Sequence, residues 1–331
     1  MSLIQKPILT IAIPTYNRAK ILDLALNRLF PQVKEFEEEI ELIISDNASQ
    51  DNTQEIIQKN VEQYNIKNII TFRQNENTGY FGNFKKCREL SNGTYFWLLS
   101  DNDLIEINVI KKIYETLKTC EKNLGAIYLH NLKNMNNFKV NFIEFEDITE
   151  EHRYFSFMLI SSLIVYNYNE EDEYLFRRFK KNDFIGFTYF IQSLRHSKKI
   201  CIIEGNIFFQ FPTKVSFDIF KSWIEDISDC VKYIKELKIL RENTINYLVN
   251  GYLERVVIHH VNRYLIYGNI LGKKYGHKNN IKQRLERYYS DYIFYSHNIA
   301  PLFETPRFIL ILKEIIRRLK NNIYKRMLRF I

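Results

Sequence analysis

The sequence predicts an α/β fold with a mostly parallel sheet flanked by helices, followed by a helical C-terminal region. In the first 120 residues, short apolar runs typical of buried strands alternate with longer segments of helical periodicity. Polar clusters follow three of these apolar runs. Strands that alternate with helices usually form a parallel sheet with helices on both faces. From residue 222 onward the pattern is mostly helical, which predicts the C-terminal region.

The predicted elements follow one another in regular order. Strands are expected at 9–13, 40–44, 68–73 and 95–99, and helices at 19–30, 51–64, 81–90 and 107–119. Beyond residue 125 the pattern weakens, with strands expected at 126–130 and 200–204, a hairpin arm at 138–145, a helix at 184–194 and an ambiguous apolar run at 154–166. These elements predict an α/β domain at 1–220 and a helical region at 221–331.

Charge is unevenly distributed along the 331 residues. The formal net charge is +8. Residues 1–110 contain 11 Lys/Arg and 15 Asp/Glu, whereas residues 241–331 contain 17 Lys/Arg and 6 Asp/Glu. A basic excess confined to one end indicates an anionic partner for that end, and both nucleic acid and anionic lipid fit this pattern.

Cysteine usage and hydropathy indicate the cellular compartment of the protein. The four cysteines lie far apart and no pair has Cys-x-x-Cys spacing. This argues against a zinc knuckle or a redox pair and favours a reducing compartment. The apolar run at 8–13 is too short for a signal peptide, and no run of about 18 apolar residues predicts a membrane-spanning helix. We therefore expect a cytoplasmic protein.

The strongest local motif is Asp101-Asn102-Asp103, directly after the apolar run that ends at Ser100. Two carboxylates separated by one residue at a strand end suit a shared Mg²⁺, which prefers one or two carboxylates together with phosphate oxygens and water. A metal held there would neutralise charge that develops on a leaving diphosphate. The alternative is a plain turn with a cap on the next helix.

Polar residues also follow the first two predicted strands. Asp46 ends the second strand, where it is placed to accept from a pyrimidine N–H, while Asp51 is expected to cap the helix that follows. The first strand ends in Pro14-Thr15-Tyr16-Asn17-Arg18, where Tyr16 suits a base and Arg18 suits a phosphate. Ligands of parallel α/β sheets bind beyond the carboxyl ends of the strands, so these clusters predict one shared site.

These motifs resemble the family-two glycosyltransferases, which have the GT-A nucleotide-diphospho-sugar transferase fold. The family pattern is Pro-x-Tyr-Asn, then Asp-(Asp/Asn)-x-Ser-x-Asp, then Asn-x-Gly with a second Asn, and finally Asp-x-Asp. In this chain the pattern appears in order as Pro14 to Asn17, Asp46 to Asp51, Asn77 to Gly79 with Asn83, and Asp101 to Asp103. The Ser-Asp-Asn-Ala-Ser form is similar to the branch of O-antigen and capsule enzymes such as abequosyltransferases.

The resemblance implies roles for the motif residues. The donor-binding set would be Pro14, Thr15, Tyr16, Asn17, Arg18, Asp46, Asn77, Gly79, Asn83, Asp101 and Asn102. Within this set, Thr15, Tyr16 and Asp46 would hold the base and ribose, and Asp101 would face the sugar or ribose. Asp103 would ligate Mg²⁺ or Mn²⁺.

The resemblance also implies an activity. The chain would move a sugar from a nucleoside-diphosphate sugar to a hydroxyl of a glycan, carried on a polyprenyl diphosphate lipid, in the synthesis of a bacterial surface polysaccharide. Residues 7–115 would form the donor half of the domain and residues 116–220 the acceptor half. The family favours inversion at the anomeric carbon.

The catalytic base is the point at which the sequence departs from the family. Many members carry a Glu-Asp pair at the start of a helix about 80 residues after the Asp-x-Asp, and its Asp deprotonates the acceptor hydroxyl. The comparable stretch here has one acid, Asp183, which is therefore the candidate base. Capping of the next helix is the alternative role for Asp183, and His130 and His196 are weaker candidates.

The C-terminal segment 307–331 predicts a basic amphipathic helix. Apolar residues recur at spacings of three or four, and residues 307–329 hold eight basic residues and one acid, Glu314. Such a helix suits the surface of an anionic leaflet, which predicts a peripheral protein on the cytoplasmic face of the inner membrane. The alternatives are a terminal helix packed on its own domain or an oligomer contact.

Three other functions compete with a glycosyltransferase. A nucleotidyltransferase of related fold usually has a Gly-rich phosphate loop after the first strand, and Tyr16-Asn17-Arg18 stands there instead. A nucleic-acid-binding protein fits the basic charge, but no RNA- or DNA-binding signature is present, so we expect no nucleic acid partner. A non-catalytic donor-binding domain is disfavoured because both acids of the Asp-x-Asp are intact.

Overall fold

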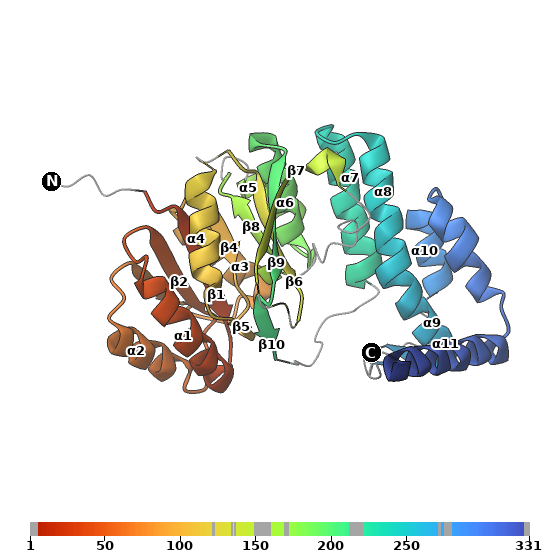
Figure 1. The fold of residues 1–331 in the computed structure, drawn as a ribbon, viewed down its shortest axis with the longest axis horizontal. Helices are drawn as coiled ribbons and strands as arrows, with labels where there is room; N and C mark the ends of the chain where they lie inside the picture. Colours follow the sequence, from red (N-terminus) through yellow and green to blue (C-terminus); the bar gives the residue numbers. More distant parts are fainter. Residues whose placement is uncertain are drawn as a thin grey trace. The chain divides into compact units, whose positions relative to one another are not determined.

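The computed structural model divides the chain into two compact units, with the division at residues 214–215. The structure describes residues 6–120, 123–133, 135, 137–148, 160–168, 172–211, 221–270, 273–274 and 280–327, with the backbone alone for 269–270, 273–274 and 318–327. The first unit holds the α/β elements and the second holds the C-terminal helices (Figure 1).

The first unit is built on a sheet that has eight strands among the described residues, in the order β3-β2-β1-β4-β8-β6-β9-β7. All neighbouring strands pair in parallel except those that involve β8 and β7, which pair antiparallel. The strands are β1 (Leu9–Thr15), β2 (Ile40–Asp46), β3 (Ile69–Arg73), β4 (Tyr95–Leu98), β6 (Ala126–Asn131), β7 (Lys139–Glu144), β8 (Leu163–Tyr166) and β9 (Lys199–Gly205).

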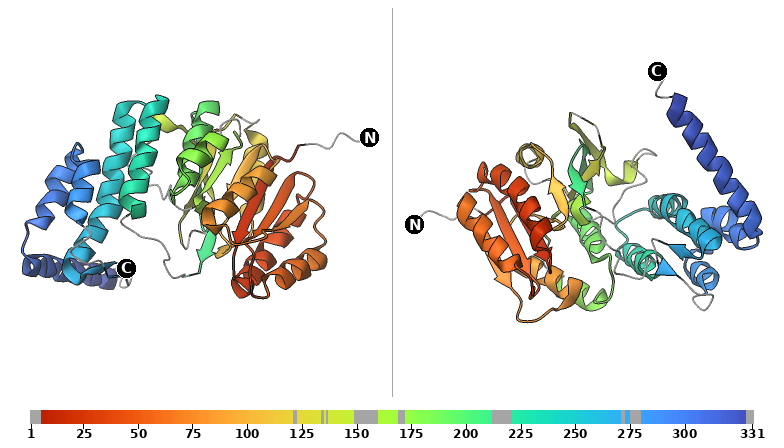
Figure 2. Two further views of the ribbon diagram at one scale, coloured as in Figure 1. Left: turned by 180° about the vertical axis from the view of Figure 1, so that it is seen from behind. Right: turned by 90° about the horizontal axis from the view of Figure 1, so that it is seen from below.

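Helices cover both faces of this sheet (Figure 1 and Figure 2). They are α1 (Ala19–Lys34), α2 (Thr53–Tyr64), α3 (Gly79–Leu90), α4 (Val109–Thr119), α5 (Asp172–Arg178) and α6 (Ile185–His196). Side chains on β4 alternate between the two faces, as the twofold repeat of a strand requires. Tyr95 and Trp97 join the main core with α1 and α4, whereas Phe96 packs near Phe84 of α3, which in turn contacts Tyr189 of α6.

The predicted mostly parallel α/β fold is confirmed. All four strands and four helices expected in the first 120 residues are present, with ends shifted by a few residues. The ambiguous run at 154–166 contains β8, an antiparallel strand inserted between β4 and β6, while residues 154–159 lie outside the described part. A strand buried on both faces reads as a continuous apolar run, which periodicity cannot distinguish from a buried helix.

A second small sheet lies directly beyond the Asp-x-Asp. β5 (Asp103–Ile105) pairs antiparallel with β10 (Phe208–Gln210), so that Asp103 lies opposite Gln210. The sequence did not predict β5, because three residues are too few to show a period. This pairing ties the Asp-x-Asp loop to the last described segment of the first unit.

The second unit is helical, as the sequence predicted. Its helices are α7 (Ile227–Leu237), α8 (Glu242–Tyr252), α9 (Ile258–Tyr267), α10 (Ile281–Tyr289) and α11 (Arg307–Met327). A π-helical stretch at Leu253–Val257 joins α8 to α9 without a break. Two further π-helical stretches, at Lys221–Asp226 and Tyr295–Ile299, precede α7 and α11 in the chain, and a short hairpin is formed by β11 (Asn269–Ile270) and β12 (Lys273–Lys274).

Candidate active site

The loop after β1 contacts the Asp-x-Asp loop after β4. Thr15, the last residue of β1, donates from its hydroxyl to Asp101 Oδ2 at 2.8 Å. The Arg18 guanidinium lies 3.9 Å from Asp101 Oδ1. These contacts follow from the fold, because β1 and β4 are parallel neighbours and their carboxyl ends meet at one edge of the sheet.

The loop after β2 is tied to the same place through Asn17. The Asn17 N–H donates to Ser49 Oγ at 2.9 Å, and Asn17 Oδ1 accepts from the Gln50 N–H at 2.7 Å. Asn17 and Ala48 both have left-handed backbone conformations, with φ of 51° and 60°. Asn adopts this region more readily than most residues, which suits Asn17 to the tight turn.

Asn47 links the loop after β2 to the start of α3. Its Nδ2 donates to Asn77 Oδ1 at 2.9 Å and to the Gly79 carbonyl at 3.1 Å, while its Oδ1 accepts from the Thr78 N–H at 2.9 Å. Gly79 has φ of +74°, the left-handed region in which glycine carries no steric penalty. All four sequence motifs therefore converge on one edge of the sheet.

Asp46 lies at the end of β2, where the sequence predicted it, and is enclosed by the loop that follows. Its side chain is fully buried. Oδ1 accepts from the backbone N–H and the hydroxyl of Ser49, and Oδ2 accepts from Gln54 Nε2 at 2.6 Å and lies 3.7 Å from Arg73 Nε. These bonds hold the loop after β2 in place, and a direct contact of Asp46 with a base stays a prediction.

Asn83 and Asn102 are likewise buried and hydrogen-bonded within the protein. Asn83 is 3% exposed, accepts from Ser45 Oγ at 2.6 Å and donates to the Ser45 carbonyl at 2.9 Å. Asn102 donates to the Phe211 carbonyl at 3.0 Å and accepts from the Ser100 hydroxyl. Their amides donate to the buried carbonyls of Ser45 and Phe211, and their contacts with a donor stay predictions.

Capping after β2 also differs in detail from the expectation. The N-cap position of α2 is Asn52, and Asp51 Oδ1 accepts from the Thr53 N–H at 3.1 Å. The other oxygen of Asp51 accepts from the Ala19 N–H at the start of α1 at 3.2 Å. Asp51 therefore joins the first turns of two helices.

The remaining predicted donor-side residues leave surface open to solvent. Tyr16 is 39% exposed, and Asn77 and Gly79 are exposed at the start of α3. Pro14 is half-buried within β1. The Nη1 atom of Arg18 is buried and makes no hydrogen bond to the described residues. A planar ring, an exposed backbone turn and an unsatisfied guanidinium nitrogen thus surround Asp101.

The two carboxylates of the Asp-x-Asp are buried and close enough to influence each other. The pKa of Asp103 is raised to about 6, chiefly by burial. The negative charge of Asp101 also raises this pKa, while hydrogen bonds with Ser161 and Gln210 lower it. Burial also raises the pKa of Asp101, against the opposing effects of Arg18 and Thr15. Burial disfavours the charged forms of both carboxyls, and a cation bound beside them would stabilise those charged forms.

The Asp-x-Asp fits a divalent metal that arrives with a diphosphate. Oδ1 of Asp103 is buried and has no hydrogen-bond partner among the described residues, and a hard cation would satisfy this oxygen. The described part of the chain holds no group of three or more His, Cys, Asp or Glu residues able to bind a metal. Asp101 and Asp103 would therefore supply one or two ligands, leaving the rest to phosphate oxygens and water, as Mg²⁺ prefers.

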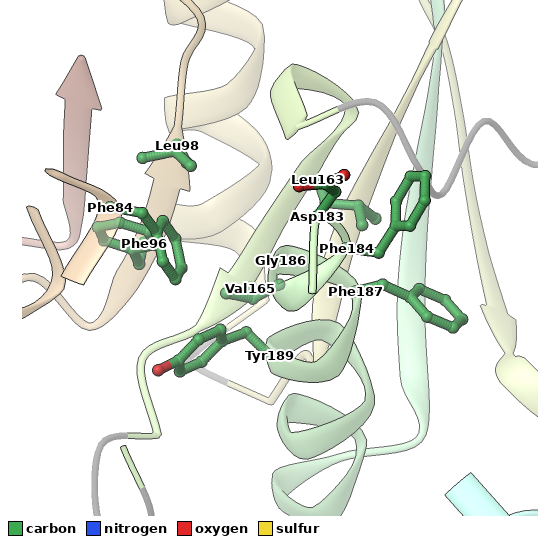
Figure 3. Close-up of a pocket in the computed structure, with 10 residues that line it drawn as sticks. All are labelled: Phe84, Phe96, Leu98, Leu163, Val165, Asp183, Phe184, Gly186, Phe187 and Tyr189. Carbon is green, nitrogen blue, oxygen red and sulfur yellow. The ribbon is translucent and has the colours of Figure 1, made fainter. Parts of the chain in front are cut away.

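An apolar pocket lies between β4, β8, α3 and α6 (Figure 3). Phe96 of β4 lies opposite Val165 of β8, so the next lining residues, Leu98 and Leu163, mark the carboxyl end of β4. Asp183 lies near Leu163 at the start of α6 (Figure 3). The lining residues are Phe84, Phe96, Leu98, Leu163, Val165, Asp183, Phe184, Gly186, Phe187 and Tyr189.

The structure separates Asp183 from the other candidate bases. Phe184 is the N-cap residue of α6, so Asp183 lies one residue before the cap, and Asn182 Oδ1 accepts from the Phe184 N–H at 2.8 Å. His130 contacts Glu204 at 3.0 Å across β6 and β9. His196 stacks on Tyr166 at the opposite end of α6. Of the three, Asp183 alone lines the pocket.

Ser161 and Gln210 are site residues that the sequence did not reveal. Ser161 Oγ accepts from the Ser100 N–H at 3.0 Å and hydrogen-bonds Asp103. Gln210 reaches Asp103 from β10. Ser161 falls within the run that was ambiguous in the sequence and Gln210 on a three-residue strand, so neither carried a motif or a period that pointed to the site.

Fold and site together define the class. The sheet order and the polar loops at the carboxyl ends of β1, β2 and β4 are those of a nucleotide-sugar transferase with the GT-A fold. Comparison gives the family: the model of glycosyl transferase family 2 matches residues 10–180, and the chain belongs to this family. This membership confirms the resemblance and decides against the nucleotidyltransferase alternative.

Similarity to curated proteins is confined to part of the chain. An abequosyltransferase of Salmonella typhimurium is 37% identical over 122 residues, which cover 37% of this chain and 35% of that protein. An uncharacterized glycosyltransferase of Mycoplasma pneumoniae is 32% identical over 108 residues, which cover 33% and 36%. The matched segment thus spans about a third of the length of these relatives.

Solved structures support the fold over more of the chain. TarS 1–349 of Staphylococcus aureus, in complex with UDP-GlcNAc, has a TM-score of 0.59 at 11% identity, covering 85% of this chain and 80% of that one. The mannosyltransferase PcManGT of Pyrobaculum calidifontis, in complex with GDP-Man and Mn²⁺, has a TM-score of 0.51 at 10% identity, covering 94% and 86%. At these identities the likeness shows the fold alone.

Proposed function

We propose that this protein transfers a sugar from a nucleoside-diphosphate sugar to a hydroxyl of a glycan acceptor in the synthesis of a bacterial surface polysaccharide. The observation that carries the proposal is the Oδ1 atom of Asp103, which is buried beside Asp101 after β4 and has no hydrogen-bond partner among the described residues of this family 2 chain. The abequosyltransferase relative supports glycosyl transfer as the reaction.

The donor binds across the loops after β1, β2 and β4. Tyr16 offers an exposed ring for the base, and Arg18 Nη1, which makes no hydrogen bond to the described residues, suits a phosphate oxygen. Asn77 and Gly79 line the nucleotide side from the start of α3. Asp46, Asn83 and Asn102 act as positioning residues, because their polar atoms hold the loops in place.

Mg²⁺ or Mn²⁺ would be held by Asp103, with Asp101 beside it. When bound, the metal supplies a positive charge that stabilises the leaving diphosphate. Arg18 adds a second positive charge on the same side, since its guanidinium lies 3.9 Å from Asp101. Ser161 and Gln210 orient the Asp103 carboxylate by hydrogen bonds.

Asp183 is proposed as the base that accepts the proton of the acceptor hydroxyl. It lies on the wall of the pocket at the carboxyl end of β4, the end from which the Asp-x-Asp loop departs. A base on the acceptor side suits direct attack on the anomeric carbon and inversion of its configuration. His130 Nδ1 lies 3.0 Å from Glu204 Oε1. Because this ring nitrogen already has a partner, His130 is less suited to the role of base.

The proposed acceptor is carried on a polyprenyl diphosphate lipid, and α11 is proposed to hold the protein at the anionic cytoplasmic face of the inner membrane. α11 docks on α9 through the buried Leu310 and through Arg307 Nε, which donates to the Ile266 carbonyl at 3.0 Å. The opposite face leaves a stripe of apolar side chains exposed, namely Phe308, Ile311, Leu312, Ile315 and Ile316.

The exposed stripe favours a surface-bound helix over a helix packed on its own domain. Packing on the domain would bury the apolar face, whereas here that face stays open. Among the described residues, no helix is long and apolar enough to cross a bilayer. Basic residues such as Lys313 and Arg317 flank the stripe, and each base near an anionic surface contributes about 1 kcal/mol.

A donor screen with a matched pair of variants tests the proposed function. Thermal shifts of the wild type with UDP-, GDP-, CDP- and dTDP-sugars, with and without Mn²⁺, should identify one donor whose stabilisation depends on metal. Asp103→Ala should abolish the metal-dependent part of donor binding and turnover, whereas Asp229→Ala, an exposed acid of α7, should leave both unchanged. Full metal-dependent turnover by Asp103→Ala would refute the proposal.

A further inference from the structure

The pocket beside Asp183 has an unusual composition for a sugar site. Among the ten described residues that line it, Asp183 has the single charged side chain and Tyr189 the single hydroxyl, while the other eight are apolar or glycine. Sugar hydroxyls need hydrogen-bond partners when they leave water, and an unpaired buried hydroxyl is unfavourable. The side chains of Phe84, Phe96 and Val165, which line the pocket, offer no such partner (Figure 3).

The pocket is also small. Its free volume is about 30 Å³, which is room for on the order of two water-sized groups. A pyranose ring with its hydroxyls does not fit into this space, whereas a methyl group does. The apolar part of the wall gains by receiving an apolar group, because apolar surface is removed from water.

Gly186 keeps the pocket open. It lies in the first turn of α6 and lines the pocket, and a Cβ added there would meet no atom within 4 Å. At other positions of the chain, close packing leaves room only for glycine. A Cβ on Gly82 would lie 2.5 Å from Thr78, and one on Gly125 would lie 2.1 Å from the Ser197 carbonyl. At Gly186 no close contact with the described residues requires a glycine.

The pocket adjoins the proposed base. Asp183 and Phe184 form one side of it, with Leu98 and Leu163 at the carboxyl end of β4. A sugar whose hydroxyl reaches the Asp183 carboxylate would place a neighbouring substituent against the apolar wall. One polar contact and one apolar contact would then fix the orientation of the same ring.

We propose that this pocket receives a methyl group of the acceptor sugar, carried near the hydroxyl that becomes glycosylated. The methyl belongs either to C6 of a 6-deoxyhexose or to an acetamido group, since both present the same apolar end. This inference rests on the proposed role of Asp183 at the acceptor hydroxyl. It makes the pocket a specificity element that distinguishes methyl-bearing acceptors from their fully hydroxylated parents.

Paired acceptors test the methyl group directly. Alkyl glycosides of 6-deoxyhexoses are compared with the parent hexosides, and 2-acetamido glycosides with the 2-hydroxy compounds, using the donor found in the thermal-shift screen. The methyl-bearing member of one pair should be preferred in kcat/KM by about tenfold or more, the range expected for one apolar group in a fitted pocket. The pair that shows the preference identifies the source of the methyl group. Equal kcat/KM within both pairs would overturn the inference.

A second experiment fills the pocket by substitutions at Gly186. Gly186→Ala and Gly186→Val add one and three carbons into open space on a helix, so both should fold. We expect the preference for the methyl-bearing acceptor to fall in Gly186→Ala and to fall further in Gly186→Val. In Gly186→Val the ratio of the two kcat/KM values should drop by about tenfold or more. The donor Kd and the slow hydrolysis of donor by water should stay unchanged. A preference that survives Gly186→Val, or a methyl dependence found on the donor sugar instead, would overturn the inference.

The two proposals fail in different ways. If no acceptor receives sugar from any donor and Asp103→Ala changes nothing, the proposed function fails. If transfer occurs and depends on Asp103 but is indifferent to the methyl group, the proposed function stands and the role of the pocket is wrong.

Discussion

Replacing Asp103 by asparagine should make the metal-free protein more stable at neutral pH while removing its function. Burial raises the pKa of Asp103 from its ordinary value of 3.8 to about 6. Below pH 3.8 the carboxyl is protonated in both states. As pH rises from there towards 6, the unfolded chain loses the proton while the folded chain keeps it, so the stability of the folded state falls.

The size of this effect follows from the same values. One pKa unit corresponds to 1.36 kcal/mol, so ionised Asp103 destabilises the folded state by about 3 kcal/mol above pH 6 and by roughly half as much near pH 5. Asparagine carries no charge at any of these pH values. Asp103→Asn should therefore exceed the wild type by up to about 3 kcal/mol at pH 7.5, and by a smaller amount near pH 5.

Tryptophan fluorescence gives the assay. The chain has two tryptophans, Trp97 on β4 of the first unit and Trp223 in the second. In a Trp223→Phe background, urea unfolding in EDTA reports on Trp97, which is fully buried in the strand that precedes the Asp-x-Asp. Adding Mn²⁺ with the donor should stabilise the wild type but not Asp103→Asn.

The reasoning would be refuted if Asp103→Asn were less stable than the wild type at pH 7.5. It would equally be refuted if the difference between the two proteins were the same at both pH values. Either result would mean that burial of the charged carboxylate is not what sets the stability of this loop.

Three further substitutions separate chemistry, framework and membrane contact. Asp183→Asn should lower kcat by about 10² or more, because asparagine cannot accept the proton. The donor Kd and the stability should stay unchanged, since asparagine can still cap a helix. If kcat is retained, Asp183 is not the base. Asn83→Ala should lower the free energy of unfolding by about 1–3 kcal/mol and weaken donor binding, since it leaves the Ser45 carbonyl without its donor, whereas the exposed Asn75→Ala should do neither. Leu312→Glu should weaken binding to phosphatidylglycerol vesicles, measured by co-sedimentation, by about tenfold or more. Asn298→Glu adds the same charge outside α11 and should change this binding little. Equal binding by both variants would contradict insertion of the stripe.

The donor half of the fold could be predicted almost completely from the sequence, and the acceptor half could not. Each strand of the first 100 residues is short, apolar and bounded by polar residues, and each helix between them has a clear period. After residue 125 the chain places β8 antiparallel between β4 and β6, although it comes later in sequence than β6. Such a strand has no pattern of its own, because it is buried on both faces and its neighbours are remote in the chain.

The site shows the same limit at the level of single side chains. Motif spacing predicted that Thr15, Asp46, Asn83 and Asp103 lie at one edge of the sheet, and they do. It did not predict which of them face a ligand, because direction depends on partners elsewhere, such as Gln54 for Asp46 and Ser161 for Asp103. Burial and hydrogen bonding therefore divide the motif residues into a framework and a reactive set.

That division explains how a loop-built site stays ordered. Asp46, Asn47, Asn83 and Asn102 have their polar atoms satisfied within the protein, so the loops are fixed before a donor binds and little ordering remains to be done on binding. Arg18 Nη1 and Asp103 Oδ1 are the exceptions, a buried donor and a buried acceptor without hydrogen bonds to the described residues. Arg18 is paired with Asp101 at 3.9 Å, but a buried donor and a buried acceptor that make no hydrogen bond still cost stability in the free protein. A phosphate and its cation would remove both costs at once, and so the same two atoms account for the predicted instability of the metal-free protein and for its affinity for a donor.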